Sequence, residues 1–230
     1  AMYRGFSEAP SLPEISEETE LQQAEEKGVD VNAGYRSRDE ALPAKYDVEG
    51  VLLPRPFKIT KVGPVHIFVE DVERSARFYT EVLGFKATEE VEYRGQRAVF
   101  LRCGAEHHSV GLFSKALQGA LGTRADTTLL AFALDVGTYQ QLREALGFFR
   151  EKGVTSKELP AELHPGIDYA AYAQDPEGHL VLLYYYMEQV GWEGRPRPSV
   201  LRRPLREPWP EALEPLSDTY ADQTFQGPLG

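Results

Sequence analysis

The side chains of this 230-residue chain best suited to proton transfer are its five histidines, because imidazole gains and loses a proton near neutral pH. They are His66, His107, His108, His164 and His179. His66 stands in a stretch where Val65, Ile67 and Val69 alternate with it, the period of a half-buried strand. Position alone leaves two interpretations of His66: a histidine satisfied within the core, or one that projects into a cavity.

The segment Val62–Phe85 is expected to position His66. It predicts a strand, then Asp71 as the cap of a helix, and then Gly84 as the residue that ends this helix. Successive side chains of a strand face opposite ways. If the apolar neighbours of His66 pack under the helix, His66 therefore points to whatever the other face of the sheet encloses.

This segment also carries a resemblance to a known family. A first-strand histidine, an aspartate and then S-x-x-F-Y-x-x-x-L-G-F, ending at Phe85, resemble the vicinal oxygen chelate superfamily. That superfamily includes glyoxalases, extradiol ring-cleavage dioxygenases, fosfomycin-resistance enzymes and bleomycin-binding proteins. Its paired βαβββ modules curl their sheets into a cup, where the first-strand histidine often binds a divalent metal. His66 occupies that position, and the resemblance covers roughly Val62–Tyr186.

The order of strand, helix and further strands occurs twice, at about 62–113 and again at about 127–187. In the second copy, Thr138 begins the helix with a capping box and Gly153 ends it. The expected fold is α+β, with two βαβββ modules forming a curled mixed β-sheet around a central cavity and helices outside. We divide the chain into an N-terminal arm (1–57), the vicinal oxygen chelate domain (58–187) and a proline-rich C-terminal tail (188–230) docked on the body or on a partner subunit.

The resemblance further implies a set of site residues. Segment 106–113, EHHSVGLF, looks like the part of extradiol dioxygenases in which the second of two histidines is an acid–base group, here His108. The segment from His164 looks like the end of their second module, where a histidine and a tyrosine line the substrate pocket. The implied catalytic residues are His108, His164 and Tyr172. The residues that we expect to contact the substrate or line the cavity are His66, Phe68, Leu129, Leu182 and Tyr184.

The other two histidines are expected to have no such role. His107 should point outward to solvent, because His108 beside it should point the other way along a strand. His179 lies next to a turn and is expected to be structural.

The resemblance does not extend to most of the residues that bind the metal in this superfamily. Extradiol enzymes use two histidines and one carboxylate, but the matching positions for the second histidine and the carboxylate are Leu129 and Leu182. Gly111 stands where glyoxalases carry a glutamate. Leucine cannot coordinate iron, so we expect no firmly held cofactor, Fe²⁺ or other divalent metal. Three arrangements would restore a site: His66 with His108 and His164, Glu188 folding back as a carboxylate ligand, or a ligand from another subunit.

Composition limits the partners. A net charge of −11 argues against nucleic acid and anionic membranes, which attract clustered Lys and Arg. No apolar run approaches the roughly 20 residues of a membrane span. The one cysteine, Cys103, excludes an internal disulfide and fits a reducing cytoplasm. We expect a cytoplasmic homodimer or higher homo-oligomer that binds a small molecule.

Three functions are compatible with these residues. The leading hypothesis is an extradiol-dioxygenase-like enzyme acting on a small, oxygen-bearing substrate, aromatic substrates included. The alternative is a metal-free binding or sequestration protein on the same fold, which Leu129 and Leu182 favour. The third is a non-catalytic subunit that needs a partner.

Overall fold

The computed structural model describes residues 45–191, 193–198 and 209–213. The expectations for most of the N-terminal arm (1–44) and for the rest of the tail fall outside these residues. A hairpin comes first in the described chain, made of β1 (Tyr46–Val48) and β2 (Val51–Leu53). The remaining strands form one seven-stranded sheet.

The first module follows the predicted order. Asp71 begins its helix, because its Oδ1 accepts a hydrogen bond from the backbone N–H of Arg74 at 2.9 Å, and Gly84 follows the helix with a φ of +76°. The helix widens into a π-helical turn at its end. The elements are β3 (Ile59–Val69), α2 (Val72–Arg77), η2 (Phe78–Val82), β4 (Lys86–Tyr93), β5 (Gln96–Arg102) and β6 (Val110–Ser114).

The second module departs from the predicted strand count. Thr138 begins its helix as expected, accepting from the backbone N–H of Gln141 at 3.2 Å. Two strands then follow the helix in the described chain, where βαβββ requires three. Pro160 and Pro165 lie in the intervening segment, and proline cannot donate to a strand ladder. The elements are α3 (Leu117–Leu121), β7 (Leu129–Val136), α4 (Tyr139–Glu151), the 3₁₀ turn η3 (Ala161–Leu163), β8 (Ala170–Gln174) and β9 (Leu180–Tyr184).

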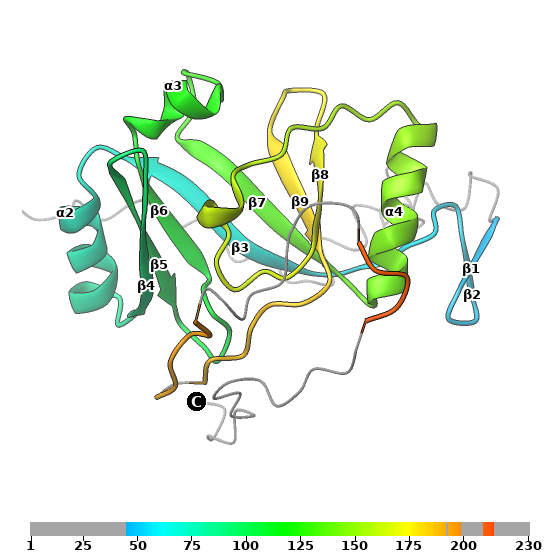
Figure 1. The fold of residues 1–230 in the computed structure, drawn as a ribbon, viewed down its shortest axis with the longest axis horizontal. Coiled ribbons are helices and arrows are strands. Elements are labelled where there is room, and N and C mark those ends of the chain that lie inside the picture. The colour runs from blue at the N-terminus through cyan, green and yellow to red at the C-terminus, as the bar shows by residue number, and fades with distance from the viewer. Residues whose placement is uncertain (1–44, 192, 199–208, 214–230) are drawn as a thin grey trace, which may run out of the picture. The chain divides into compact units, whose positions relative to one another are not determined.

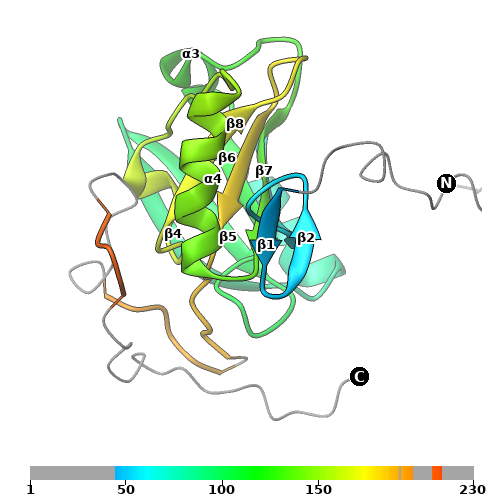
Figure 2. The same cartoon turned by 90° about the vertical axis from the view of Figure 1, so that its right-hand side faces the viewer.

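The two modules join through their first strands. The strand order is β4-β5-β6-β3-β7-β9-β8, in which β3 runs parallel to β6, β7 runs parallel to β9 and the other pairs are antiparallel. Figure 1 shows α2 and α4 at opposite ends of this sheet. Figure 2 shows α4 lying along its second half with the β1–β2 hairpin beside it. The α+β class with a mixed sheet and outer helices is confirmed.

Each helix covers one half of the outer face. The helix α2 packs Val72 against Leu101 and Leu112, whereas α4 packs Leu142 against Val181 and Leu183. The opposite, inner face carries its own buried cluster, which joins both modules. Its buried members include Phe68, Phe100, Phe113, Leu130, Ala131, Leu163, Tyr172, Leu180, Leu182 and Tyr184. The inner face is thus the place where residues of the two modules meet.

The described part of the tail contacts the body. Trp209 packs its ring on Tyr169 with centroids 5.5 Å apart, and Tyr139 Oη donates to the carbonyl of Pro210 at 2.6 Å. In the described chain, no helix has both the length and the apolar character that crossing a membrane requires.

Candidate functional site

Three histidines and one glutamate form a continuous line of contacts on the inner face. His66 Nε2 lies 2.9 Å from His108 Nε2, and His108 Nδ1 lies 3.0 Å from His107 Nδ1. The far nitrogen of His107, Nε2, lies 3.0 Å from Glu89 Oε2. The three rings have exposures of 0–1%, while the Glu89 side chain is 19% exposed. The line therefore runs from the partly exposed Glu89 to the fully enclosed His66.

His164 extends this line on the other side of His66. The two rings stack with centroids 5.4 Å apart and planes 30° apart, and His164 also meets Tyr172 edge-on at 5.8 Å. His164 follows the η3 turn and Tyr172 lies on β8, so the second module supplies both. Within the described chain, both ring nitrogens of His164 and the Nδ1 of His66 lack a hydrogen-bond partner. An unsatisfied buried polar atom costs about 1–3 kcal/mol, so these nitrogens are suited to meeting a ligand.

Glycines provide the space that the rings occupy. His66 is paired with Gly111 across β3 and β6, where a Cβ on the glycine would lie 2.8 Å from His66 Cδ2. A Cβ at Gly166 would lie 2.3 Å from His107 Cγ, and the φ of Gly166 is +80°. Contacts this close exclude any side chain, so Gly111 serves here to admit an imidazole.

The inward orientation of the His107 ring differs from the sequence prediction. Strand alternation predicts that it points to solvent, yet its ring is 0% exposed. Alternation does not apply there, because β6 begins only at Val110 and the residues before it are irregular. The backbone N–H of His107 instead donates to the carbonyl of Glu188 at 2.8 Å. The chain thus turns both neighbouring histidines inward.

Glu89 is the site residue that sequence reasoning missed. The register of β4 against β5 shifts between Ala87 and Glu89, so that Glu89 lies opposite Phe100, a member of the inner cluster. Such a bulge turns a side chain to the other face of the sheet. No local sequence signal distinguishes Glu89 from Glu90, whose carboxylate pairs with Arg97 at the surface.

The apolar residues expected to line the cavity fall into two groups. Phe68, Leu182 and Tyr184 belong to the inner cluster with exposures of 0–2%. Leu129 is not a member of this cluster. A register shift between β3 and β7 pairs it with Ile67, whereas His66 is paired with Ala131. Leu129 therefore does not lie in the row of His66, and its contact with a ligand stays a prediction.

Burial sets the charge state of these imidazoles. Desolvation lowers the pKa of His66 to about 3. Desolvation also lowers the pKa of His108 well below its usual range, and the neighbouring histidines lower it further. The pKa of His164 is lowered in the same way, by desolvation and then by His66. At neutral pH the three rings are uncharged, so each carries one N–H and one lone pair.

The line of contacts then has a direction. An ionised carboxylate only accepts hydrogen bonds, so Glu89 requires the proton of His107 on Nε2. In the tautomer that leaves His107 Nδ1 without a proton, this nitrogen accepts from His108 Nδ1–H. His108 Nε2 then carries a lone pair and accepts from His66 Nε2–H. The nitrogen of His66 left without a proton is Nδ1.

The donor set does not fit the metal centre implied by the resemblance. In the described part of the chain, no group of three His, Cys, Asp or Glu side chains is arranged to hold an ion. The three-histidine alternative is thus not formed there. Glu188 does not fold back either, because its Oε1 accepts from the backbone N–H of Arg197. Leu182 and Ala131 occupy inner positions around the histidines and offer no donor.

His179, the fifth histidine, lies outside this line of contacts. The Nδ1 of His179 is 2.9 Å from Asp175 Oδ2 within the turn before β9. Its expected structural role agrees with this contact.

The family of this chain is indicated by comparison with known proteins. Residues 61–183 match the family model described as "Glyoxalase/Bleomycin resistance protein/Dioxygenase superfamily". A stretch of 53 residues is 40% identical to a Catechol-2,3-dioxygenase of Bacillus subtilis (strain 168), which is 23% of this chain and 18% of that protein.

Two solved structures show similar folds. One is 2,2',3-trihydroxybiphenyl 1,2-dioxygenase from Sphingomonas wittichii strain RW1, with a TM-score of 0.48 and 22% identity over 65% of this chain and 55% of that one. The other is an extradiol ring-cleaving dioxygenase from B. fuscum, with a TM-score of 0.49 and 21% identity over 65% of this chain and 37% of that one. The match thus spans about half or less of the length of these relatives.

Proposed function

The chain belongs to the glyoxalase/bleomycin resistance protein/dioxygenase superfamily, and we propose that its inner histidines bind a small, flat molecule carrying one or two hydroxyl groups on an aromatic ring. The observation that carries this proposal is the pair of ring nitrogens on His164, both buried and both without a partner in the described chain. Buried polar groups are normally satisfied. A ligand hydroxyl is a partner that would satisfy them.

The surroundings of His164 favour an aromatic ligand. His66 stacks on one side of it and Tyr172 lies edge-on at 5.8 Å. Apolar side chains complete the neighbourhood, among them Leu163 and Leu182, both 0% exposed. Such a site excludes water and favours a planar ring over a sugar or a phosphate. The 53-residue match to a Catechol-2,3-dioxygenase supports a catechol-type ligand.

The chemistry that these residues offer is the transfer of a hydroxyl proton. His66 carries a lone pair on Nδ1, which has no hydrogen-bond partner within the described chain. Burial makes this ring a weak base by itself. When the proton comes from a bound hydroxyl, however, the imidazolium forms beside an oxyanion, and this pairing offsets the cost of burial. No step of this proposal uses a metal, because the described donors do not fit one.

A thermal-shift screen tests the proposal. Phenols and catechols should raise the melting temperature of the protein, whereas sugars and inorganic phosphate should not. The stabilisation should be lost in His164→Phe, which keeps a flat ring but removes both nitrogens, and weakened in Tyr172→Phe. Stabilisation by phosphate alone, or equal stabilisation of wild type and His164→Phe by catechol, would refute it.

Ring-cleaving dioxygenase activity is the second candidate. It is favoured by the identity to a Catechol-2,3-dioxygenase over 53 residues. Its test is oxygen uptake with catechol, with and without added ferrous ion. Uptake that depends on ferrous ion and disappears in His66→Ala would establish this activity, and no uptake in either condition would exclude it.

A further inference from the structure

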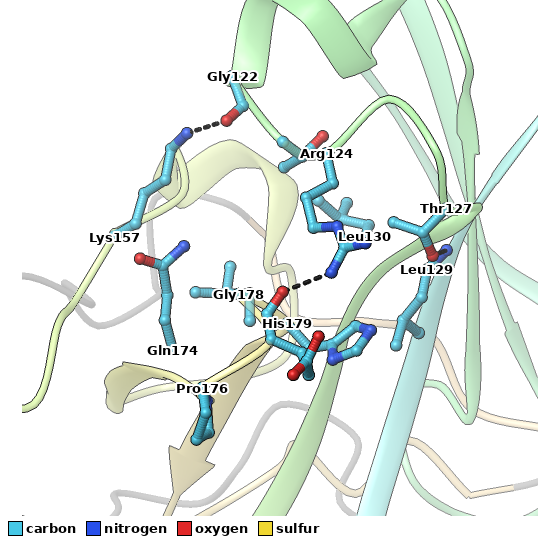
Figure 3. Close-up of a pocket in the computed structure, with 13 residues that line it drawn as sticks. Gly122, Arg124, Thr127, Leu129, Leu130, Lys157, Gln174, Pro176, Gly178 and His179 are labelled. Atoms are coloured by element: carbon cyan, nitrogen blue, oxygen red, sulfur yellow. Dashed lines mark hydrogen bonds between the residues drawn. The ribbon is translucent and has the colours of Figure 1, made fainter.

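A cavity of about 310 Å³ lies at the edge of the second module. It is separate from the row of contacts formed by His66, His108, His107 and Glu89, which we call the histidine line. Figure 3 shows Lys157, Gln174 and Pro176 on one wall, and Arg124, Leu130 and Leu129 on the other. Leu130 and Leu180, which line it, are 2% and 4% exposed and belong to the inner cluster. The cavity thus has a buried apolar floor and a polar mouth.

The register of the sheet places this cavity on the inner face. His66 is paired with Ala131, Ala131 with Leu180, and Leu180 with Gln174. Directly paired residues share a face of the sheet, so these four form one row across β3, β7, β9 and β8. Neighbouring strands are about 4.8 Å apart, which separates Gln174 from His66 by about 14 Å along the row. The cavity and the histidine line are therefore two separate places on one surface.

Lys157 supplies the charge of the cavity. Its ammonium donates to the carbonyl of Gly122, and it forms no ion pair with a carboxylate of the described chain. The other basic side chains that line the cavity already have carboxylate partners. Arg124 binds both carboxylate oxygens of Asp126, and His179 is paired with Asp175. Within the described chain, Lys157 is therefore the cation of this cavity that can still take an anionic partner.

Gln174 supplies a second polar contact. Its backbone N–H donates to the carbonyl of Thr155 at 2.8 Å, but its side-chain amide makes no hydrogen bond within the described chain. Figure 3 shows this amide directed toward the same space as Lys157. An ammonium and an amide N–H₂ together offer donors for the two oxygens of a carboxylate.

We propose that this cavity binds a small monocarboxylic acid with an apolar body. The carboxylate lies between Lys157 and Gln174, and the apolar body rests on Leu129, Leu130 and Leu180. The volume is at the lower end of the about 300–1,000 Å³ typical of ligand pockets, which limits the body to about one ring. The proposal is independent of the function of the histidine line.

Isothermal titration calorimetry with benzoate tests this site, with benzyl alcohol as the uncharged analogue. We expect benzoate to bind with a stoichiometry of one and benzyl alcohol to bind at least about tenfold more weakly, as the loss of a charge-assisted contact predicts. Lys157→Met should weaken benzoate binding by a similar factor, whereas Lys157→Arg should retain most of it. Lys152→Met is the matched control, because Lys152 is an exposed lysine outside the cavity.

Several results would overturn the proposal. Equal affinity for benzyl alcohol would show that the carboxylate is not recognised. Unchanged benzoate affinity in Lys157→Met, or an equal loss in Lys152→Met, would show that Lys157 does not form the site. Binding of inorganic phosphate in preference to benzoate would identify a different ligand class. Circular dichroism of each variant establishes that the fold is retained before binding is compared.

Discussion

His66 Nε2 lies 2.9 Å from His108 Nε2, and neither ring is more than 1% exposed. This contact joins β3 to the irregular segment before β6, and both residues come from the first module. It continues through His107 to Glu89 on β4. A row of imidazoles sealed from water, with a carboxylate at one end, is therefore the central feature of the inner face.

The first prediction concerns stability against pH. The pKa values of His66, His108 and His164 are lowered by folding, whereas unfolded histidine has a pKa of about 6.5. Below that pH the unfolded chain binds protons that these three rings do not bind. Their contribution is therefore fully present above about pH 6.5 and is lost as the pH falls toward the folded pKa values. The groups facing them are His107, Glu89 and Tyr172.

Urea unfolding between about pH 7.5 and 4.5 measures this effect. In the part of that interval below about pH 6.5, each histidine should lower the free energy of unfolding by about 1.4 kcal/mol per pH unit. His164→Phe should reduce the slope by about one histidine's share. A free energy of unfolding that stays constant down to about pH 5, or an unchanged slope in His164→Phe, would show that these rings are not buried and neutral.

The second prediction concerns Glu89 and the tautomers of the line. Glu89 holds a proton on His107 Nε2, and in the neutral tautomer of His107 the proton of His108 then lies on Nδ1. Glu89→Met removes that acceptor, so both tautomers of His108 should become populated. Nitrogen NMR of the imidazoles at about pH 8 distinguishes them. Glu90→Met is the control, because Glu90 pairs with Arg97 outside the line. A His108 tautomer unchanged in Glu89→Met would contradict the assigned direction.

The third prediction concerns Gly166. Its φ of +80° and its contact with His107 leave no room for a Cβ, which would lie 2.3 Å from His107 Cγ. Gly166→Ala should lower the free energy of unfolding by about 3 kcal/mol or more, from backbone strain plus overpacking. Gly153 has a similar φ of +64°, but a Cβ there would meet nothing within 4 Å, so Gly153→Ala should cost only about 1–2 kcal/mol. Equal losses in urea unfolding would mean that His107 does not pack against Gly166.

Local signals predict the framework of the fold. Asp71 and Thr138 begin the two helices that the sequence assigns to them, because their side chains accept hydrogen bonds from the first helical turns. Alternation around His66 also predicts its face correctly, since Ile67 packs on the outer side and His66 lies inside. These features depend on residues that are close in sequence, so the local sequence pattern is enough to predict them.

Register shifts and irregular backbone account for the errors. Glu89 faces inward because of a bulge in β4, and Leu129 lies outside the row of His66 because of a shift between β3 and β7. His107 turns inward because β6 begins only at Val110. Each of these depends on pairing between distant segments, so no local pattern of residues indicates it.

Binding of catechol to the metal-free protein tests the central claim most directly. Calorimetric titration with a chelator present compares catechol with 1,2-dimethoxybenzene, which has the same ring but no hydroxyl to donate. The account predicts that catechol binds with a stoichiometry of one and that the dimethoxy analogue binds at least about tenfold more weakly. Lys157→Met, which lies outside the histidine line, should bind catechol as wild type does. No binding in chelator, with binding restored by ferrous ion, would contradict the account.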